Sequence, residues 1–194
     1  MIDLGPATLG VTRLLDAVGD DRLDGPTPCP DYTVRDILAH LEGLAVAFRD
    51  AAGKDLGPTT DTDPGTGLPP LTEDWRTALP RRLDELAAAW RAPEAWEGTT
   101  RAGGVTLPGE VAGLVALNEV LIHGWDLARA TGQGYAPDEA SLEISYAFLA
   151  PGADDPAERG PFGPPMPVAD GAPLLDRVIG LSGRRPDWRP GVAA

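Results

Sequence analysis

Apolar residues recur at helical spacing along most of this chain, and runs rich in proline and glycine separate the helical segments. The long segments are residues 7–18, 33–53, 72–90 and 108–130, and a shorter one, residues 138–149, follows them. In the long segments an apolar residue returns every three or four positions, which places an apolar stripe on one face of a helix. Such helices bury their stripes against one another. The sequence therefore predicts an all-α fold, a bundle of four principal helices.

Capping residues mark the ends of two of these segments. Thr33 is a good N-cap, with Asp36 three residues later in the position from which a side chain bonds back to the cap. Pro108 suits the first turn of a helix, and Gly132 is a typical residue to end one. Pro80 lies inside the third long segment, where it is expected to kink the helix or divide it in two.

The remaining segments are predicted to be less regular. Residues 54–70 are expected to form a mobile loop, and residues 91–107 are expected to be irregular. Proline and glycine are concentrated towards the carboxyl end, where a short apolar helix is expected at residues 174–181. We therefore divide the chain into the bundle, residues 1–150, and a short Pro- and Gly-rich C-terminal extension, residues 151–194, that packs back on it.

Charge and hydropathy argue against two classes of partner. The net charge of −14 disfavours nucleic acid, whose binding depends on Lys and Arg neutralising phosphates. The longest apolar runs fall far short of the roughly 18 residues that a membrane span needs. The amino terminus lacks the basic region of a signal peptide. We expect a cytoplasmic protein, a monomer or homodimer, that binds neither nucleic acid nor a membrane.

The two histidines of the chain, His40 and His123, lie on different predicted helices. Glu119 precedes His123 by one helical turn, about 40° away around the axis, and Asp126 falls on nearly the same line. Ionised side chains among small and apolar neighbours are costly to bury without partners, and a divalent cation removes that cost. Two imidazoles and a carboxylate bind zinc and leave a fourth position open. The sequence therefore predicts a metal site formed by His40, Glu119 and His123.

The same pattern allows a simpler interpretation. A histidine at the flank of a helix is commonly a hydrogen-bonded packing residue, and Glu119 can simply face solvent. Asp126 is expected to support a ligand from behind, or to form a salt bridge with Arg129, rather than to bind the ion itself.

Several other side chains are candidates for a smaller role. Cys29 is the single cysteine, so the chain cannot form an internal disulfide. Cys29 lies before the helix that carries His40, and the seven residues from Thr33 to His40 span about 10 Å along its axis. The Cys29 sulfur therefore reaches the same ion only if the loop folds back. We predict that Cys29 is a small buried loop residue, with a catalytic role as the alternative. Arg184 or Arg185 could hold a carboxylate, although exposed charge is the expected role. Four of the five tryptophans are expected to be structural, although one of the first three could wall a pocket: Trp75, Trp90, Trp96 and Trp125.

Two stretches resemble a bacterial family, the DinB-like or mycothiol-dependent maleylpyruvate isomerase-like metalloproteins. The first is Thr-Pro-Cys-Pro-Asp-Tyr-Thr-Val-Arg-Asp at residues 27–36, which leads to His40. The second is Glu-Val-Leu-Ile-His-Gly-Trp-Asp-Leu-Ala-Arg-Ala-Thr-Gly at residues 119–132. The tail at residues 162–184 resembles the closing segment of one subgroup, so the resemblance covers most of the chain, while residues 50–100 match loosely. Tyr32 stands where family members often have Trp.

The resemblance implies a DinB-like four-helix bundle that binds zinc or another divalent metal. Members hold the ion through two histidines and an acidic residue or a third histidine, and that role transfers to His40, Glu119 and His123. The resemblance also implies mycothiol as a cosubstrate for some relatives. It does not fix the reaction, because the superfamily includes isomerases, thiol transferases and proteins without known activity.

Three functions follow from these expectations. The leading hypothesis is a metal-dependent enzyme that uses mycothiol, which is either transferred to a small electrophile or assists its isomerisation. The metal activates mycothiol because a metal-bound thiol is deprotonated and becomes a nucleophile. The second is a metal hydrolase that uses zinc-bound water, with Asp126 as a possible proton acceptor. The third is a non-enzymatic binding or stress protein that retains the bundle.

Overall fold

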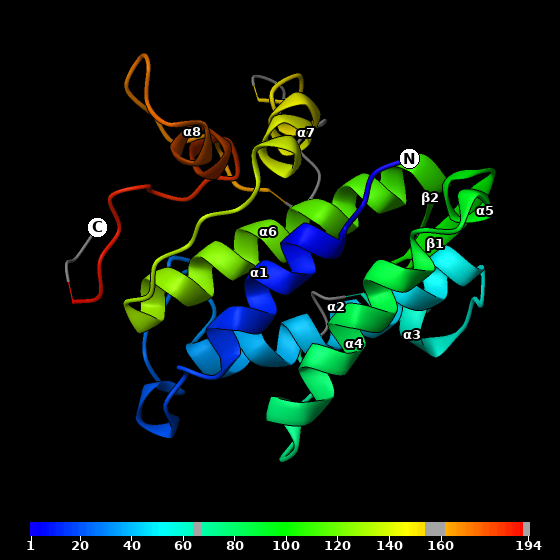
Figure 1. The fold of residues 1–194 in the computed structure, drawn as a ribbon, viewed down its shortest axis with the longest axis horizontal. Helices are drawn as coiled ribbons and strands as arrows, with labels where there is room; N and C mark the ends of the chain where they lie inside the picture. Colours follow the sequence, from blue (N-terminus) through cyan, green and yellow to red (C-terminus); the bar gives the residue numbers. More distant parts are fainter. Residues whose placement is uncertain (64–66, 154–161, 192–194) are drawn as a thin grey trace.

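The computed structural model describes residues 1–63, 67–153 and 162–191, and helices dominate it (Figure 1). The bundle consists of α1 Gly5–Leu15, α2 Val34–Gly53, α4 Trp75–Ala89 and α6 Gly109–Thr131. The other helical elements are η1 Asp20–Arg22 (a single 3-10 turn), α3 Pro58–Asp61, α5 Pro93–Trp96, α7 Glu139–Leu149 and α8 Leu174–Leu181. Among the described residues the strands are confined to an antiparallel hairpin before α6, formed by β1 Thr99–Ala102 and β2 Val105–Pro108.

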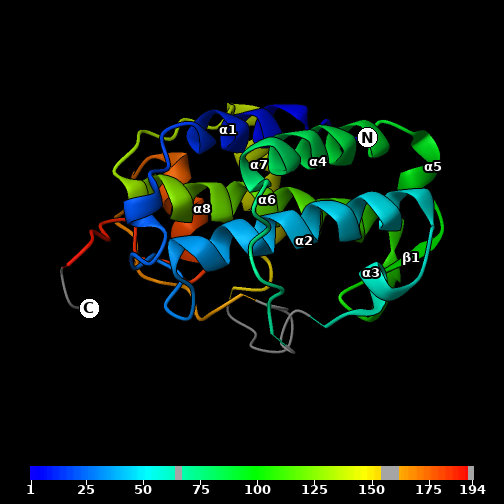
Figure 2. The same cartoon turned by 90° about the horizontal axis from the view of Figure 1, so that it is seen from below.

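The central element of the bundle is α6. It packs against α1 and α2, and α4 packs against the same two helices, as the views in Figures 1 and 2 illustrate. By length and composition α6 is apolar enough to cross a membrane, but 78% of its apolar window is buried inside the protein. Burial in the core accounts for that apolar character. This arrangement confirms the predicted all-α fold.

Tryptophans anchor the end of the bundle near α5. Trp90 is fully buried, and its indole N–H donates to the carbonyl of Phe48 on α2 at 3.1 Å. The indole N–H of Trp96 donates to the carbonyl of Trp90 at 2.8 Å, and the two rings meet edge to face. Trp75 and Trp125 are buried as well. These four tryptophans therefore have the structural role predicted for them.

The predicted caps set the position of α2 and the end of α6. The Asp36 N–H donates to the Thr33 hydroxyl at 3.3 Å, and the Asp36 carboxylate accepts from the Thr33 N–H at 2.9 Å. This reciprocal capping box fixes where α2 begins. Gly132 ends α6 with a φ of 74°, a backbone conformation that glycine adopts without strain. Both predictions are confirmed.

The predictions for two connecting segments were wrong, the first of them in part. Residues 54–70, expected to form a loop, contain the short helix α3. Residues 91–107 are not irregular, because they contain α5 and most of the hairpin. The turn of the hairpin places Gly103 and Gly104 at positive φ, 59° and 76°, which is the two-residue turn that suits the twist of paired strands. The Gly-Gly pair between two threonine-containing runs was the overlooked signal. Of the two outcomes expected at Pro80, a kink or a division of the helix, division does not occur, since α4 is continuous through Pro80.

A second, smaller cluster of buried apolar residues lies on the far side of α6 from the bundle core. Leu121 and Ile122 of α6 meet Leu142 and Leu149 of α7 and Val178 of α8 in this cluster. Figure 1 shows α7 and α8 together beside α6. The predicted domain boundary near residue 150 falls between α7 and α8, which share this buried cluster. The boundary stays a prediction.

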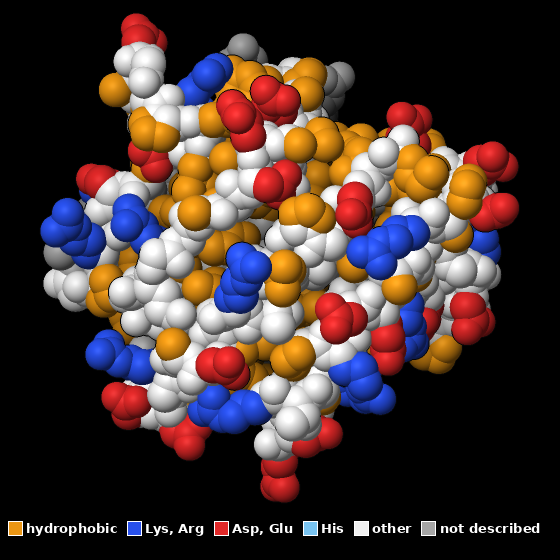
Figure 3. All heavy atoms as spheres, viewed as in Figure 1, with side chains coloured by type: hydrophobic (Ala, Val, Ile, Leu, Met, Phe, Trp, Pro, Cys, Tyr) orange, Lys and Arg blue, Asp and Glu red, His pale blue; other side chains and the backbone are white. Residues whose placement is uncertain are grey.

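The face that carries α1 and α4 has no visible concentration of one charge in the space-filling view. Acidic and basic side chains are interspersed over it, with apolar side chains between them (Figure 3). Ion pairs join oppositely charged side chains at both ends of α4: Arg76 in its first turn pairs with Asp20, and Arg91, just beyond its last residue, pairs with Asp3. This face therefore offers no single-sign charged patch.

Candidate metal centre

The structure brings His40, Glu119 and His123 together between two helices. His40 comes from α2, and the other two come from successive turns of α6. The Nε2 atom of His40 lies 3.0 Å from Oε2 of Glu119, and Nε2 of His123 lies 3.3 Å from the same oxygen. One ligand atom from each of the three residues lies within 4.8 Å of the others. The three side chains predicted as ligands therefore converge on one point.

The spacing of these atoms fits a small divalent ion. Tetrahedral ligands with bonds of about 2.0–2.1 Å lie roughly 3.3–3.4 Å apart, close to the two observed separations. The side chains are also well shielded, with exposed fractions of 13% for His40, 13% for Glu119 and 8% for His123. Shielding raises the strength of any charge interaction in the site. The donor set and its geometry suit zinc, whose binding here remains a prediction.

A proton holds this cluster together when no metal is bound. Burial is the largest influence on Glu119 and favours its neutral form, but hydrogen bonds with His123 and His40 outweigh it and hold its pKa well below the usual range. Burial likewise lowers the pKa of His123, and hydrogen bonds with Asp126 and Glu119 overcome it and raise the pKa to about 9. An imidazolium at His123 therefore takes the place of a cation at neutral pH.

Asp126 lies behind His123. Its Oδ2 atom is 3.0 Å from Nδ1 of His123, and its side chain is completely buried. A carboxylate in this position fixes which imidazole nitrogen carries the proton and turns Nε2, with its lone pair, towards the ligand group. Of the two roles expected for Asp126, the geometry agrees with the supporting one.

The arginine partner of Asp126 is Arg184, and here the expectations were wrong. Nη2 of Arg184 donates to Oδ2 of Asp126 at 3.1 Å, and the Arg184 side chain is only 13% exposed. Arg129, the expected partner, instead donates to the carbonyl of Pro186 and lies over the ring of Trp125. The extension thus contributes a buried cation to the candidate site, and no local sequence signal indicated it.

The loop before α2 folds back towards the site. The hydroxyl of Thr27 donates to the carbonyl of Tyr32 at 2.7 Å, and the Cys29 N–H donates to the same hydroxyl at 3.1 Å. This closed loop holds the Tyr32 ring 5.6 Å from the His40 ring and 6.3 Å from the His123 ring, measured between centroids. Tyr32 was identified in the sequence only as a departure from the family pattern, and the structure makes it a wall of the site.

Cys29 is half-buried in this loop, close to charged residues of the site. Burial is the main cause that raises the pKa of its thiol to about 11, with Arg184 acting in the opposite direction and Asp126 in the same one. A thiol with this pKa is neutral and unreactive near pH 7. Cys29 is therefore suited to packing rather than to nucleophilic attack, as predicted.

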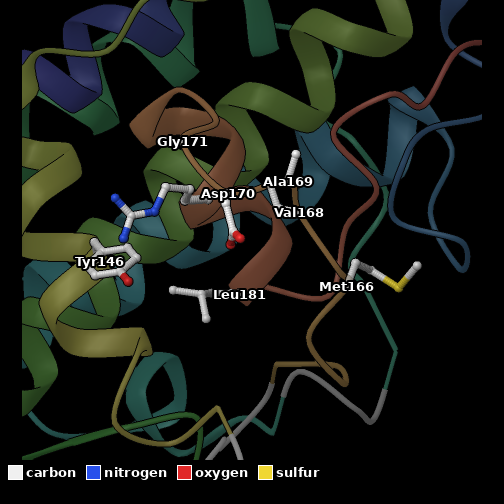
Figure 4. A pocket seen from close by; sticks show the side chains of 8 residues that line it. Tyr146, Met166, Val168, Ala169, Asp170, Gly171 and Leu181 are labelled. Carbon is white, nitrogen blue, oxygen red and sulfur yellow. The ribbon is translucent and has the colours of Figure 1, made fainter.

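A separate hollow of about 480 Å³ lies between α7, α8 and the preceding turn (Figure 4). The guanidinium of Arg177 lies 4.3 Å above the ring of Tyr146 on one side of it. Asp170 and Leu181 also line it. None of the residues that line this hollow belongs to the His40, Glu119 and His123 group.

Comparisons with known proteins agree with this architecture. Two uncharacterized proteins from strains of Mycobacterium tuberculosis are each 29% identical over 175 residues, which cover 88% of this chain and 90% of theirs. A crystal structure of a mycothiol-dependent maleylpyruvate isomerase has a TM-score of 0.62 and 21% identity, covering 95% of this chain and 89% of that one. A mutant of such an isomerase also has a TM-score of 0.62, with 20% identity, covering 94% of this chain and 88% of that one.

These structural similarities establish the fold, and a family model adds the sequence relationship. The model of the mycothiol maleylpyruvate isomerase N-terminal domain matches residues 4–128, which include α1, α2, α4 and nearly all of α6. The matched region contains His40, Glu119 and His123 and makes up more than half of the chain. The protein belongs to the mycothiol maleylpyruvate isomerase N-terminal domain family.

Proposed function

We propose that this protein is a mycothiol-dependent enzyme with a divalent metal ion, zinc or a similar one, held by His40, Glu119 and His123. In this proposal the thiol of mycothiol is activated at the metal and is transferred to a small electrophile, or assists its isomerisation. The convergence of three ligand atoms from two helices within 4.8 Å carries the proposal. The family supports it, because solved structures with this fold are described as mycothiol-dependent enzymes.

The arrangement of side chains suits thiol activation. A bound divalent ion supplies the positive charge that keeps a thiol sulfur ionised near neutral pH. Glu119 and the two imidazoles account for three coordination positions and leave one for the sulfur of a cosubstrate. Asp126 holds His123 in the orientation that binding needs. With the neutral Cys29 as its single cysteine, the chain has no sulfur that competes for the role of nucleophile.

The hydrolase alternative has less support. It needs a base that accepts a proton from water in the open position, and Asp126 was the candidate. Its side chain is fully buried behind His123, with Oδ2 shared between His123 and Arg184. Asp126 is therefore already engaged by two partners and shielded from solvent, which does not favour it as a base for water. A non-enzymatic role requires only the bundle and stays an outcome of the test below.

Calorimetric titration of the zinc-loaded protein with mycothiol tests the proposed function. We expect saturable binding in the range of about 1 μM to 1 mM, typical of enzyme substrates, and none to protein stripped of metal. The Cys29→Ser variant is the control, and its unchanged binding would show that no disulfide with the protein is involved. Absence of binding to metal-loaded protein contradicts the proposal.

A substrate panel then distinguishes the three functions. The metal-loaded protein is incubated with epoxides, maleyl-type acids and esters, with and without mycothiol. Turnover of an epoxide or a maleyl-type acid only when mycothiol is present supports the thiol-dependent enzyme. Ester hydrolysis at the same rate with and without mycothiol supports the hydrolase. Inactivity on every substrate of the panel supports a non-enzymatic binding protein.

The zinc affinity is expected to rise with pH. In the metal-free protein His123 has a pKa of about 9, above its ordinary value, so that below pH 9 zinc must displace a proton from it. Release of one proton strengthens apparent binding about tenfold per pH unit below the pKa and has no effect above it. Competition with a chelator of known pH dependence at pH 7, 8 and 9 measures this slope. A flat profile over this range would show that no such proton is held.

A further inference from the structure

The extension places one buried cation beside the candidate metal centre. Arg184 donates to Oδ2 of Asp126 at 3.1 Å, and the same oxygen is 3.0 Å from Nδ1 of His123. The Nε atom of Arg184 and the Oδ1 atom of Asp126 are buried without a hydrogen-bond partner among the described residues. A guanidinium this well shielded is weakly screened by salt, so its charge acts over the whole site.

The fold holds Arg184 in this position. The short helix α8 buries Val178 and Ile179 completely, and its end directs the chain back towards α6. The Arg184 N–H donates to the carbonyl of Ile179 at 3.1 Å, and Nη1 of the side chain donates to the carbonyl of Ser182 at 3.1 Å. The guanidinium is thus fixed by α8 and by Asp126 together, unlike a side chain on a free tail.

Formal charges show what Arg184 adds. Glu119 and Asp126 carry two negative charges, which by themselves neutralise a divalent ion held by Glu119 and the two histidines. With Arg184 the whole group keeps one positive charge. The neighbouring thiol and phenol do not change this sum, because burial raises the pKa values of Cys29 and Tyr32 and both stay neutral near pH 7.

We propose that Arg184 makes the open coordination position select an anionic ligand, a thiolate or a carboxylate, over a neutral one. The inference rests on the proposed metal centre. It adds that the ligand in the open position is negatively charged and that Arg184 determines this preference. An anion in that position meets a site with one net positive charge, whereas without Arg184 it meets a neutral one. The preferred cosubstrate or substrate therefore enters as an anion.

Arg185 provides a matched control. It follows Arg184 directly, but its side chain is 40% exposed and pairs with Asp187 at 3.1 Å. Solvent and this carboxylate screen its charge from the metal centre. A substitution there removes the same formal charge from the same segment without changing the charge of the site.

Spectroscopic titration of the cobalt-loaded protein at about pH 8 tests the inference. Thiocyanate is the anionic probe and imidazole the neutral one, and both change the visible absorption of four-coordinate cobalt when they bind. In R184Q we expect thiocyanate binding to weaken about tenfold and imidazole binding to change less than about threefold. R184K keeps the charge and should stay within about threefold of the wild type for both probes, as should R185Q.

A second variant, D126N, is expected to change the thiocyanate affinity in the opposite direction. D126N removes one negative charge, so at saturating cobalt we expect thiocyanate to bind about tenfold more tightly. If R184Q fails to fold, equal or weaker thiocyanate binding in D126N still overturns the inference, because the charge count behind it requires tighter binding. Equal thiocyanate affinity in wild type and the folded R184Q, or weaker thiocyanate binding in D126N, overturns the inference. A wild-type protein that binds no cobalt or zinc refutes the metal centre itself, which is a different result.

Discussion

Replacing His40 or His123 by alanine is expected to lower the zinc affinity by about 100- to 1000-fold. Structural zinc sites bind with apparent free energies of roughly 10–16 kcal/mol, so that each of four ligands accounts for about 3–4 kcal/mol. The two histidines lie on different helices and reach the same carboxylate oxygen of Glu119, at 3.0 and 3.3 Å. Loss of either one leaves two protein ligands, too few to hold zinc against a chelator.

The measurement is the zinc content after dialysis against a chelator, followed by competition titration of each variant. Cys29→Ala is the control, because this residue lies in the loop beside the site but outside the ligand group. It should retain wild-type affinity. Normal zinc content in both histidine variants would contradict the ligand assignment, and loss of zinc in Cys29→Ala would place the sulfur among the ligands.

Local signals explain why so much of the site was predictable. Thr33 and Asp36 determine where α2 starts, and this start together with the apolar stripe fixes the direction in which His40 points. Glu119 and His123 are four residues apart, so any helix through them places both on one face. Two such faces meet because α2 and α6 share one core. Each step depends on residues close together in the sequence.

The missed features depend on contacts between distant residues. Arg184 is 58 positions from Asp126, and its burial follows from the packing of α8 on α6, which no periodicity in the extension reveals. The hairpin is an exception, because its Gly-Gly turn was a local signal that received too little weight.

The match to the family model ends close to the metal centre. It covers residues 4–128, whereas α7, α8 and Arg184 lie beyond it. The predicted ligands thus lie in the region that the family model matches, and the cation behind them lies in the extension. The residues that would hold an ion therefore lie in one part of the chain. The residue proposed to set the net charge around that ion lies in another part. Proteins of this family that differ in their extensions are therefore expected to differ in ligand preference more than in metal binding.

Asp126→Asn is expected to lower the zinc affinity by about 10- to 100-fold, the range found when a carboxylate behind a metal-bound histidine is removed. The variant keeps the shape of the side chain and loses its charge. Nδ1 of His123, 3.0 Å from Oδ2 in the wild type, then faces a neutral acceptor that stabilises the bound imidazole less. Arg184 loses its anionic partner at the same time, which adds a destabilising contribution to the folded protein.

Zinc competition titrations of Asp126→Asn and Glu110→Gln, together with thermal unfolding in the presence of a chelator, separate these two effects. Glu110 is an exposed residue in the first turn of the same helix, so its variant removes a carboxylate from α6 without touching the site. It should match the wild type in both measurements. If Asp126→Asn lowers only the unfolding temperature and binds zinc as tightly as the wild type, the carboxylate serves the fold alone, because a residue that orients His123 for the ion must change the affinity for that ion.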